Sequence, residues 1–103
     1  MRIEHYSEAK LKKELTDIIG QRLDLSKYKV FFFGSRVTGR GNDRSDIDVG
    51  IDGPAAIPWQ IMSEIREKLY NLPTLYKIDV VDFYDASPKF REVAIENIEF
   101  LQR

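Results

Sequence analysis

The sequence contains no cysteine and a single histidine, and these scarcities exclude several kinds of chemistry. Without cysteine the chain has no disulfide, no thiolate nucleophile and no Cys-ligated zinc. One histidine makes Ser-His-Asp catalysis a poor hypothesis. The absence of cysteine also fits a reducing compartment, so we expect a cytoplasmic protein.

The sequence also lacks a long hydrophobic run and an excess of either charge. No stretch of about 18 apolar residues occurs, and no basic start leads into an apolar segment, so we expect neither a membrane span nor a cleaved signal. Sixteen Lys and Arg against 17 Asp and Glu give a net charge of −1. No global basic field draws the protein to a polyanion, so we do not expect a nucleic-acid partner, and any phosphate recognition must be local.

The chain has the size and composition of one domain. Its 103 residues are 43% hydrophobic and 32% charged, without repeats or low-complexity tracts. A chain of this length can bury one core but not two. We therefore expect a single domain over residues 1–103.

Three segments have the apolar spacing of amphipathic helices. The first covers residues 7–23, with Ser7 as the N-cap, and the second runs from Pro58 to about residue 72, where Pro73 follows. The third begins after Pro88 and is predicted to reach residue 101. Its apolar positions are Phe90, Val93, Ala94, Ile95, Ile98 and Leu101.

Three segments have the composition of strands. Residues 29–33 are a short aromatic and aliphatic run, typical of a fully buried strand. Residues 46–51 alternate acidic and aliphatic side chains, and residues 77–83 are rich in β-branched residues. The first two strands are joined by a connection too short for a comfortable parallel crossover, containing a turn or short helix, so we expect them to be antiparallel. The predicted fold is α/β (α+β), a small mixed β-sheet with helices packed on one face.

Gly34 and Ser35 come directly after the first strand. A glycine at a strand end lets backbone amides approach a phosphate closely, and the serine adds a hydroxyl. The glycine spacing fits neither a P-loop nor a dinucleotide-binding fingerprint. Taken alone, the pair fits an anion cradle or an ordinary surface loop.

Asp46 and Asp48 lie on the opposite face of the second strand from Ile47 and Val49. Side chains at i and i+2 of a strand share a face and can converge on a hard cation. Aspartate is depleted in strands, so two in one strand favour Mg²⁺ that bridges nucleotide phosphates. The alternative is the solvent-facing side of an amphipathic edge strand.

The third strand offers a third carboxylate at Asp79 or Asp82. These residues have opposite parity, so at most one faces the Asp46 and Asp48 site in a regular strand. Asp79 sits among aliphatic residues at mid-strand, whereas Asp82 lies near the strand end, where it could cap a turn. We choose Asp79 as the third acid, a metal ligand or the general base for an acceptor hydroxyl.

These residues together resemble a known family. Gly34-Ser35, ten intervening residues, Asp46-x-Asp48 and then Asp79 on a later hydrophobic strand is similar to the pattern of the minimal nucleotidyltransferase family, within the DNA polymerase beta-like nucleotidyltransferase superfamily. The resemblance covers essentially the whole chain and implies a nucleotidyltransferase-like core.

The resemblance also implies an activity and roles for particular residues. It implies a transferase that takes ATP as substrate and needs Mg²⁺, with Mn²⁺ as an alternative cation. The implied nucleotide-binding residues are Gly34, Ser35, Arg36 and Ser45, and the implied catalytic and metal-binding residues are Asp46, Asp48 and Asp79.

The resemblance further implies a partner. Small members of this family are the antitoxins of two-protein modules whose toxin is a HEPN-domain protein, and they transfer AMP from ATP to a toxin tyrosine. A second reading is a non-catalytic module that neutralises the toxin by stoichiometric contact. A small-molecule nucleotidyltransferase is a third and weaker one, because the chain has no room for an acceptor domain. The resemblance leaves homo-oligomers and hetero-oligomers open.

Several aromatic residues could form a surface for such a partner, although aromatic residues at these spacings belong more often to a core. The residues concerned are Trp59, Tyr70, Tyr76, Phe83, Tyr84 and Phe90.

Overall fold

The computed structural model describes residues 7–34, 46–74, 76–95 and 98–101. The expected turn or short helix between the first two strands falls in 35–45, outside these residues. No helix in the described ranges is long and apolar enough to cross a membrane. The elements are, in chain order, α1 (Glu8–Gly20), β1 (Lys29–Phe33), β2 (Ile47–Asp52), α3 (Trp59–Tyr70), β3 (Ile78–Asp82), the 3₁₀ helix η1 (Phe83–Asp85), α4 (Pro88–Ile95) and β4 (Glu99–Phe100).

The four strands form one mixed sheet in the order β3-β2-β1-β4. β1 and β2 are antiparallel, which confirms the prediction, and β2 and β3 are parallel across the α3 connection. The end of β1 therefore lies beside the beginnings of β2 and β3, along the edge of the sheet that is formed by strand ends. This edge is where the conspicuous glycine and aspartates of the sequence come together.

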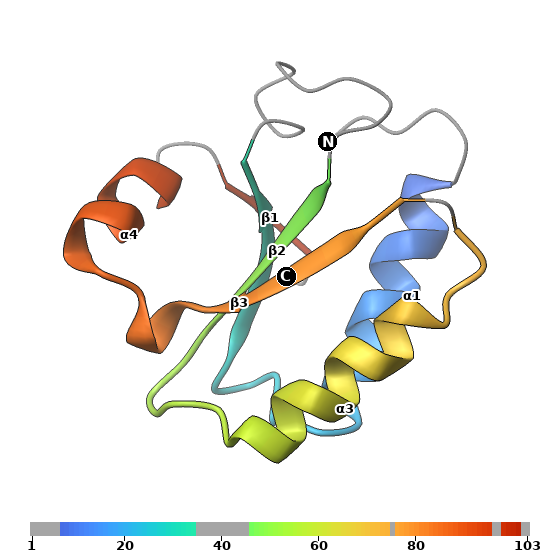
Figure 1. Ribbon diagram of the computed structural model, residues 1–103, viewed down its shortest axis with the longest axis horizontal. Coiled ribbons are helices and arrows are strands. Elements are labelled where there is room, and N and C mark those ends of the chain that lie inside the picture. Colours follow the sequence, from blue (N-terminus) through green and yellow to red (C-terminus); the bar gives the residue numbers. More distant parts are fainter. Residues whose placement is uncertain (1–6, 35–45, 75, 96–97, 102–103) are drawn as a thin grey trace.

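The main core lies between one face of the sheet and two helices, α1 and α3 (Figure 1). The N-cap Ser7 accepts a hydrogen bond from the Lys10 backbone N–H, as the sequence indicates. Every second residue of β2 enters this core, because alternate strand side chains share a face. The fully buried members are Leu11, Leu15, Ile19, Val30, Phe32, Ile47, Val49, Ile51 and Ile65.

The opposite face of the sheet carries a second, aromatic cluster of Phe31, Phe33 and Phe83. Phe90 of α4 adds a ring contact to Phe33 at a centroid distance of 6.0 Å, so α4 lies on this face, away from α1 and α3 (Figure 1). The sequence prediction placed all helices on one face. The reason for the difference is that residues 29–33 are apolar on both sides of the strand, so each side needs a cover.

The last helix is shorter than predicted. α4 ends at Ile95, and Glu99 and Phe100 form β4, which pairs antiparallel with β1. The extension of the helix to residue 101 was wrong, because the second edge of β1 offers backbone hydrogen bonds that no local pattern reveals. The Phe31 and Phe100 rings meet edge to face at 5.9 Å, and Lys12 forms an ion pair with Glu99 at 3.0 Å.

Candidate active site

Strand register places two of the predicted acids side by side. Asp48 of β2 is the partner of Asp79 in β3 and of Phe33 in β1. Paired residues of neighbouring strands point to the same side of a sheet, so both carboxyls lie on the face that carries Phe33. Asp48 is half-buried, and Asp79 retains 42% of its side-chain exposure.

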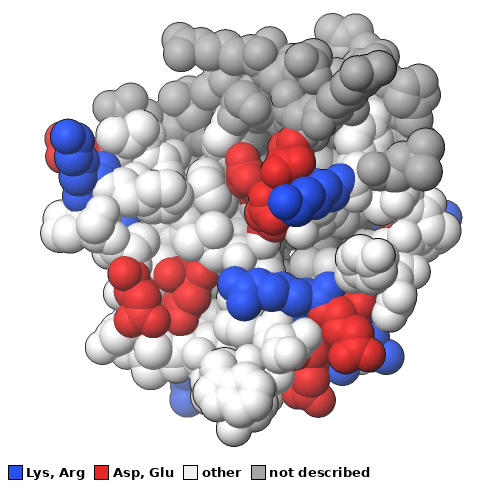
Figure 2. Space-filling view, in the orientation of Figure 1, with Lys and Arg blue, Asp and Glu red and all other residues white. Residues whose placement is uncertain are grey.

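Asp46 completes a group of three carboxyls. It immediately precedes β2, and its carboxyl lies close enough to that of Asp79 to raise the pKa of Asp79. Near the middle of the face shown in Figure 2, a cluster of acidic side chains lies against a basic one. We call Asp46, Asp48 and Asp79 the acid cluster.

Two carboxyls of the acid cluster, those of Asp48 and Asp79, have raised pKa values. Partial burial raises the pKa of Asp48 above its ordinary value, and the neighbouring Asp79 and Asp46 raise it further. Burial and the neighbouring Asp46 carboxyl likewise raise the pKa of Asp79, while Lys77 and Arg66 act in the opposite direction. A bound cation would relieve this repulsion.

Lys77 is a residue that the sequence analysis did not single out. Its Nζ lies 3.8 Å from Asp79 Oδ1, and its side chain is 72% exposed. The signal was present in the sequence, because residues 77 and 79 have the same parity and share a face of a strand. Lys77 is the basic group closest in sequence to the third acid.

Gly34 brings the end of β1 against the acid cluster. Its φ is +88°, a left-handed conformation that side chains rarely adopt. A β-carbon on residue 34 would lie 2.3 Å from Asp48 Oδ2. The backbone at Gly34 therefore lies so close to the Asp48 carboxyl that only glycine fits there. The other residues implied in nucleotide binding, Ser35, Arg36 and Ser45, lie outside the described residues.

Asp82 has a different environment from Asp79. Its Oδ2 accepts a hydrogen bond from the Ile57 backbone N–H at 2.8 Å, and its Oδ1 accepts one from Tyr84 at 3.0 Å. These bonds fasten the end of β3 to the segment before α3 and to η1. Asp82 is thus engaged at the other end of the strand from the acid cluster.

The acid cluster has the donor chemistry of a magnesium site but not the closed arrangement of one. Within the described ranges, no three acidic or histidine side chains stand at positions that would hold a metal ion. Asp79 forms an ion pair with Lys77 at 3.8 Å. Carboxylate oxygens are the ligands that Mg²⁺ prefers.

An open groove of about 1040 Å³ begins at the acid cluster and crosses β3. Asp48 and Asp79 line it, as do Arg66 and Tyr70 of α3 and Phe90 of α4. Trp59, Tyr70, Tyr84 and Phe90 among the aromatic residues considered above are exposed, whereas Phe83 is buried. Of the exposed ones only Tyr70 and Phe90 line the groove, which thus carries aromatic and basic side chains beside the acids.

A mixed sheet whose adjacent strands gather acidic side chains beside a glycine is the architecture of a nucleotidyltransferase core. Residues 28–103 match the family described as "Polymerase beta, Nucleotidyltransferase", and the chain belongs to this family.

A curated relative and two solved structures are similar to the chain. The Probable protein adenylyltransferase MntA of Haemophilus influenzae is 29% identical over 66 residues. These residues make up 64% of the chain and 58% of the length of that protein. A toxin-antitoxin structure with AMP-PNP matches 88% of the chain and 72% of its own, with a TM-score of 0.65 and 18% identity. A structure of the tri-AMPylated Shewanella oneidensis HEPN toxin in complex with MNT antitoxin matches 91% of the chain and 71% of its own, with a TM-score of 0.61 and 16% identity. At these identities the structural matches show the shared fold.

Proposed function

We propose that the chain is a Mg²⁺-dependent protein adenylyltransferase that moves AMP from ATP to a tyrosine hydroxyl of a HEPN-domain partner and so acts as its antitoxin. The observation that carries this proposal is the meeting of Asp46, Asp48 and Asp79 beside Gly34 at one edge of the sheet. The names of the similar proteins support the nucleotide and the HEPN partner, and the tyrosine is what the family resemblance implies.

Three carboxyls would hold the metal: Asp46, Asp48 and Asp79. Bound there, Mg²⁺ or Mn²⁺ would neutralise charge on the transferred phosphoryl group and on the departing pyrophosphate. The raised pKa values of Asp48 and Asp79 fit this role, because a cation returns both groups to the ionised form.

The nucleotide end of the site would be built on Gly34. Because residue 34 has no side chain, backbone amides after β1 can lie close to the β and γ phosphates. Ser35 would add its hydroxyl there, and Arg36 and Ser45 would support the same loop.

In the transfer, the acceptor oxygen attacks the α-phosphorus of ATP. The bond from that phosphorus to the bridging oxygen breaks, and pyrophosphate leaves. Asp79 would accept the proton of the acceptor hydroxyl, with Lys77 beside it to favour the carboxylate before the proton arrives.

The second candidate function is a binding module that masks a toxin without catalysis. The observation that favours it is the exposure of the aromatic side chains at the two ends of α3, with Tyr70 at 89% and Trp59 at 75%. The two candidates predict different behaviour of one variant. If catalysis neutralises the toxin, Asp48→Asn should bind the partner without protecting against it; if masking does, the variant should protect as well as the wild type.

The test is label transfer from ATP carrying a labelled α-phosphate. The chain is incubated with Mg²⁺ or Mn²⁺ and a HEPN-domain toxin, in parallel with Asp46→Asn, Asp48→Asn and the control Asp17→Asn on the exposed face of α1. We expect label on the partner with the wild type and the control only. The assay is repeated with labelled GTP, CTP and UTP. A stable complex without transfer from any of these nucleotides or from ATP would favour the binding module.

A further inference from the structure

β3 forms one border of the sheet, and the groove from the acid cluster passes over it. Among the described elements, α3 lines the groove on one side and α4 on the other, with β3 between them (Figure 1). Arg66 Nη2 donates to the Val80 carbonyl at 3.2 Å and covers part of the strand's outer backbone. Contacts on this face would therefore be made largely by side chains.

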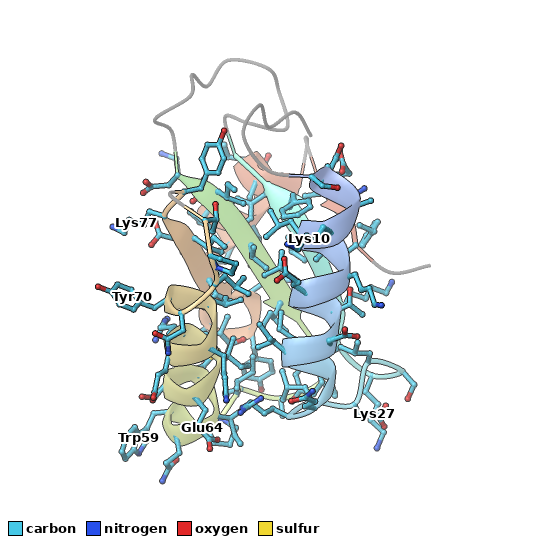
Figure 3. All side chains as sticks on the ribbon, turned by 90° about the vertical axis from the view of Figure 1, so that its right-hand side faces the viewer. Lys10, Lys27, Trp59, Glu64, Tyr70 and Lys77 are labelled. Atoms are coloured by element: carbon cyan, nitrogen blue, oxygen red, sulfur yellow. The ribbon has the colours of Figure 1, made fainter. Side chains whose placement is uncertain are left out.

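The side chains of this face are of the kinds that anchor protein interfaces. Tyr70 is 89% exposed and lines the groove directly. Figure 3 shows Trp59, Tyr70 and Lys77 projecting from the same side of the molecule, Trp59 and Tyr70 from the two ends of α3. Exposed Trp, Tyr and Arg side chains are enriched among residues that dominate binding energy. We call Arg66, Tyr70 and Lys77, which line the groove, the β3 face.

The charge of the β3 face favours an acidic partner surface. The acidic residues that line the groove are Asp48 and Asp79, and the basic ones are Arg66 and Lys77. Once the acids are occupied with a cation, the groove presents the two basic groups. Carboxylates on the partner would complement these two groups and steer the encounter.

The size and position of the groove decide between classes of occupant. A volume of about 1040 Å³ with an open mouth is at the upper limit for a small-molecule pocket. A second copy of this chain seated on the β3 face would cover Asp48 and Asp79 and block access of an acceptor to them. A protein segment that presents a hydroxyl at the acid end is large enough to fill the groove, and it brings that hydroxyl to Asp48 and Asp79.

We infer that the β3 face is the docking surface for the acceptor protein, with Tyr70 as an anchor and with acidic side chains of the acceptor against Arg66 and Lys77. This inference rests on the proposed function for the acceptor's identity. It adds the part of the surface that receives the acceptor and the charge that the acceptor carries around its hydroxyl.

The experiment compares Tyr70→Ala with Tyr84→Ala, a second exposed tyrosine that does not line the groove. Affinity for the HEPN-domain toxin is measured by titration calorimetry at low and high salt. Label transfer is measured separately, and affinity for ATP with Mg²⁺ is measured without the toxin. For Tyr70→Ala we expect an affinity for the partner that is lower by about tenfold or more, with unchanged ATP affinity. Tyr84→Ala should match the wild type, and salt should weaken wild-type binding.

Binding and transfer together separate the two proposals. If the wild type binds the partner but transfers nothing, the proposed function fails, while a loss of binding confined to Tyr70→Ala still supports the docking surface. Equal partner binding by Tyr70→Ala and wild type overturns the docking surface and leaves transfer to be judged by itself. A wild-type chain that binds no partner, or that self-associates through Tyr70, also overturns it.

Discussion

Gly34 and Asp48 are packed so closely that a β-carbon on residue 34 would lie 2.3 Å from the Asp48 carboxylate oxygen. The glycine is also at φ +88°, so two independent constraints exclude a side chain there. The end of β1 and the acid cluster are therefore one structural unit. A change at residue 34 must displace the acid that we assign to metal binding.

Gly34→Ala should reduce nucleotide transfer strongly and destabilise the fold. The left-handed backbone alone costs about 1–2 kcal/mol for a residue with a β-carbon, and the contact with Asp48 adds to this. Transfer rate and thermal unfolding measure the two effects. Gly20→Ala is the control, because its β-carbon would meet only the flexible Leu25 side chain, at 3.1 Å. A Gly34→Ala protein with wild-type transfer would refute the close packing of these residues.

Removal of charge from the acid cluster should stabilise the metal-free protein. The folded-state pKa values of Asp48 and Asp79 are raised, so ionisation of these groups favours the unfolded chain. The folded state gains from its protonated acids at low pH, and this gain is lost as pH rises through the raised pKa values. Asp48→Asn and Asp79→Asn should therefore unfold at a higher temperature than wild type at pH 7 in EDTA. The difference should disappear below the ordinary pKa of 3.8.

Magnesium should reverse that order. Added Mg²⁺ with ATP should raise the unfolding temperature of the wild type, because a ligand that binds only the folded state stabilises it by mass action. Asp48→Asn should respond much less. Thermal scans across Mg²⁺ concentrations measure the effect, and Asp17→Asn should behave as the wild type does. An equal response by Asp48→Asn would remove Asp48 from the proposed metal ligands.

Asp79 and Asp82 should have separable roles. Asp79→Asn should lower transfer by roughly 10²–10⁴-fold, as expected for loss of a general base. Asp82→Ala should retain transfer and lose about 1–3 kcal/mol of stability, because it leaves the Ile57 and Tyr84 amides without their acceptors. Transfer rates and denaturant unfolding distinguish the two. If folded Asp82→Ala were inactive and Asp79→Asn active, the third acid would be Asp82.

The bidentate pair between Asp52 and Arg91 should link α4 to the sheet without a part in transfer. Arg91 Nη2 lies 2.9 Å from Asp52 Oδ2, and both side chains are about one third exposed. Arg91→Ala should lower stability by about 1 kcal/mol or less, since solvent screens such pairs. Transfer with Mg²⁺ should remain near the wild-type rate. If Arg91→Ala folded but were inactive, the Asp52 and Arg91 pair would belong to the active site.

Local sequence patterns were sufficient for the central elements. The strand at Lys29–Phe33 agrees to the residue, and the alternation in β2 correctly places Ile47, Val49 and Ile51 in the core. The helical spacing before Pro73 correctly predicted α3 within two residues. These patterns are reliable because each follows from the burial of a single face of one element.

Long-range contacts decided the remaining parts of the fold. Ile98 and Leu101 continue the helical spacing of α4, yet Glu99 and Phe100 form a strand, because the edge of β1 accepts them. The position of α4 on the second face follows from Phe31, Phe33 and Phe83, whose cluster is built from two distant segments. The local sequence of α4 and β4 contains no sign of the strand or the aromatic cluster against which each of them packs.

The sequence by itself determined the chemical content of this protein: a glycine after a buried strand, two aspartates at strand spacing and further acids on a later strand. Side-chain parity followed directly, because it depends only on the alternation of a strand. The parallel register of β2 and β3 decided that Asp79 stands beside Asp48. It also decided that Asp82 is bonded elsewhere and that the groove opens over β3. Register depends on pairing between segments about 30 residues apart, which no local pattern contains.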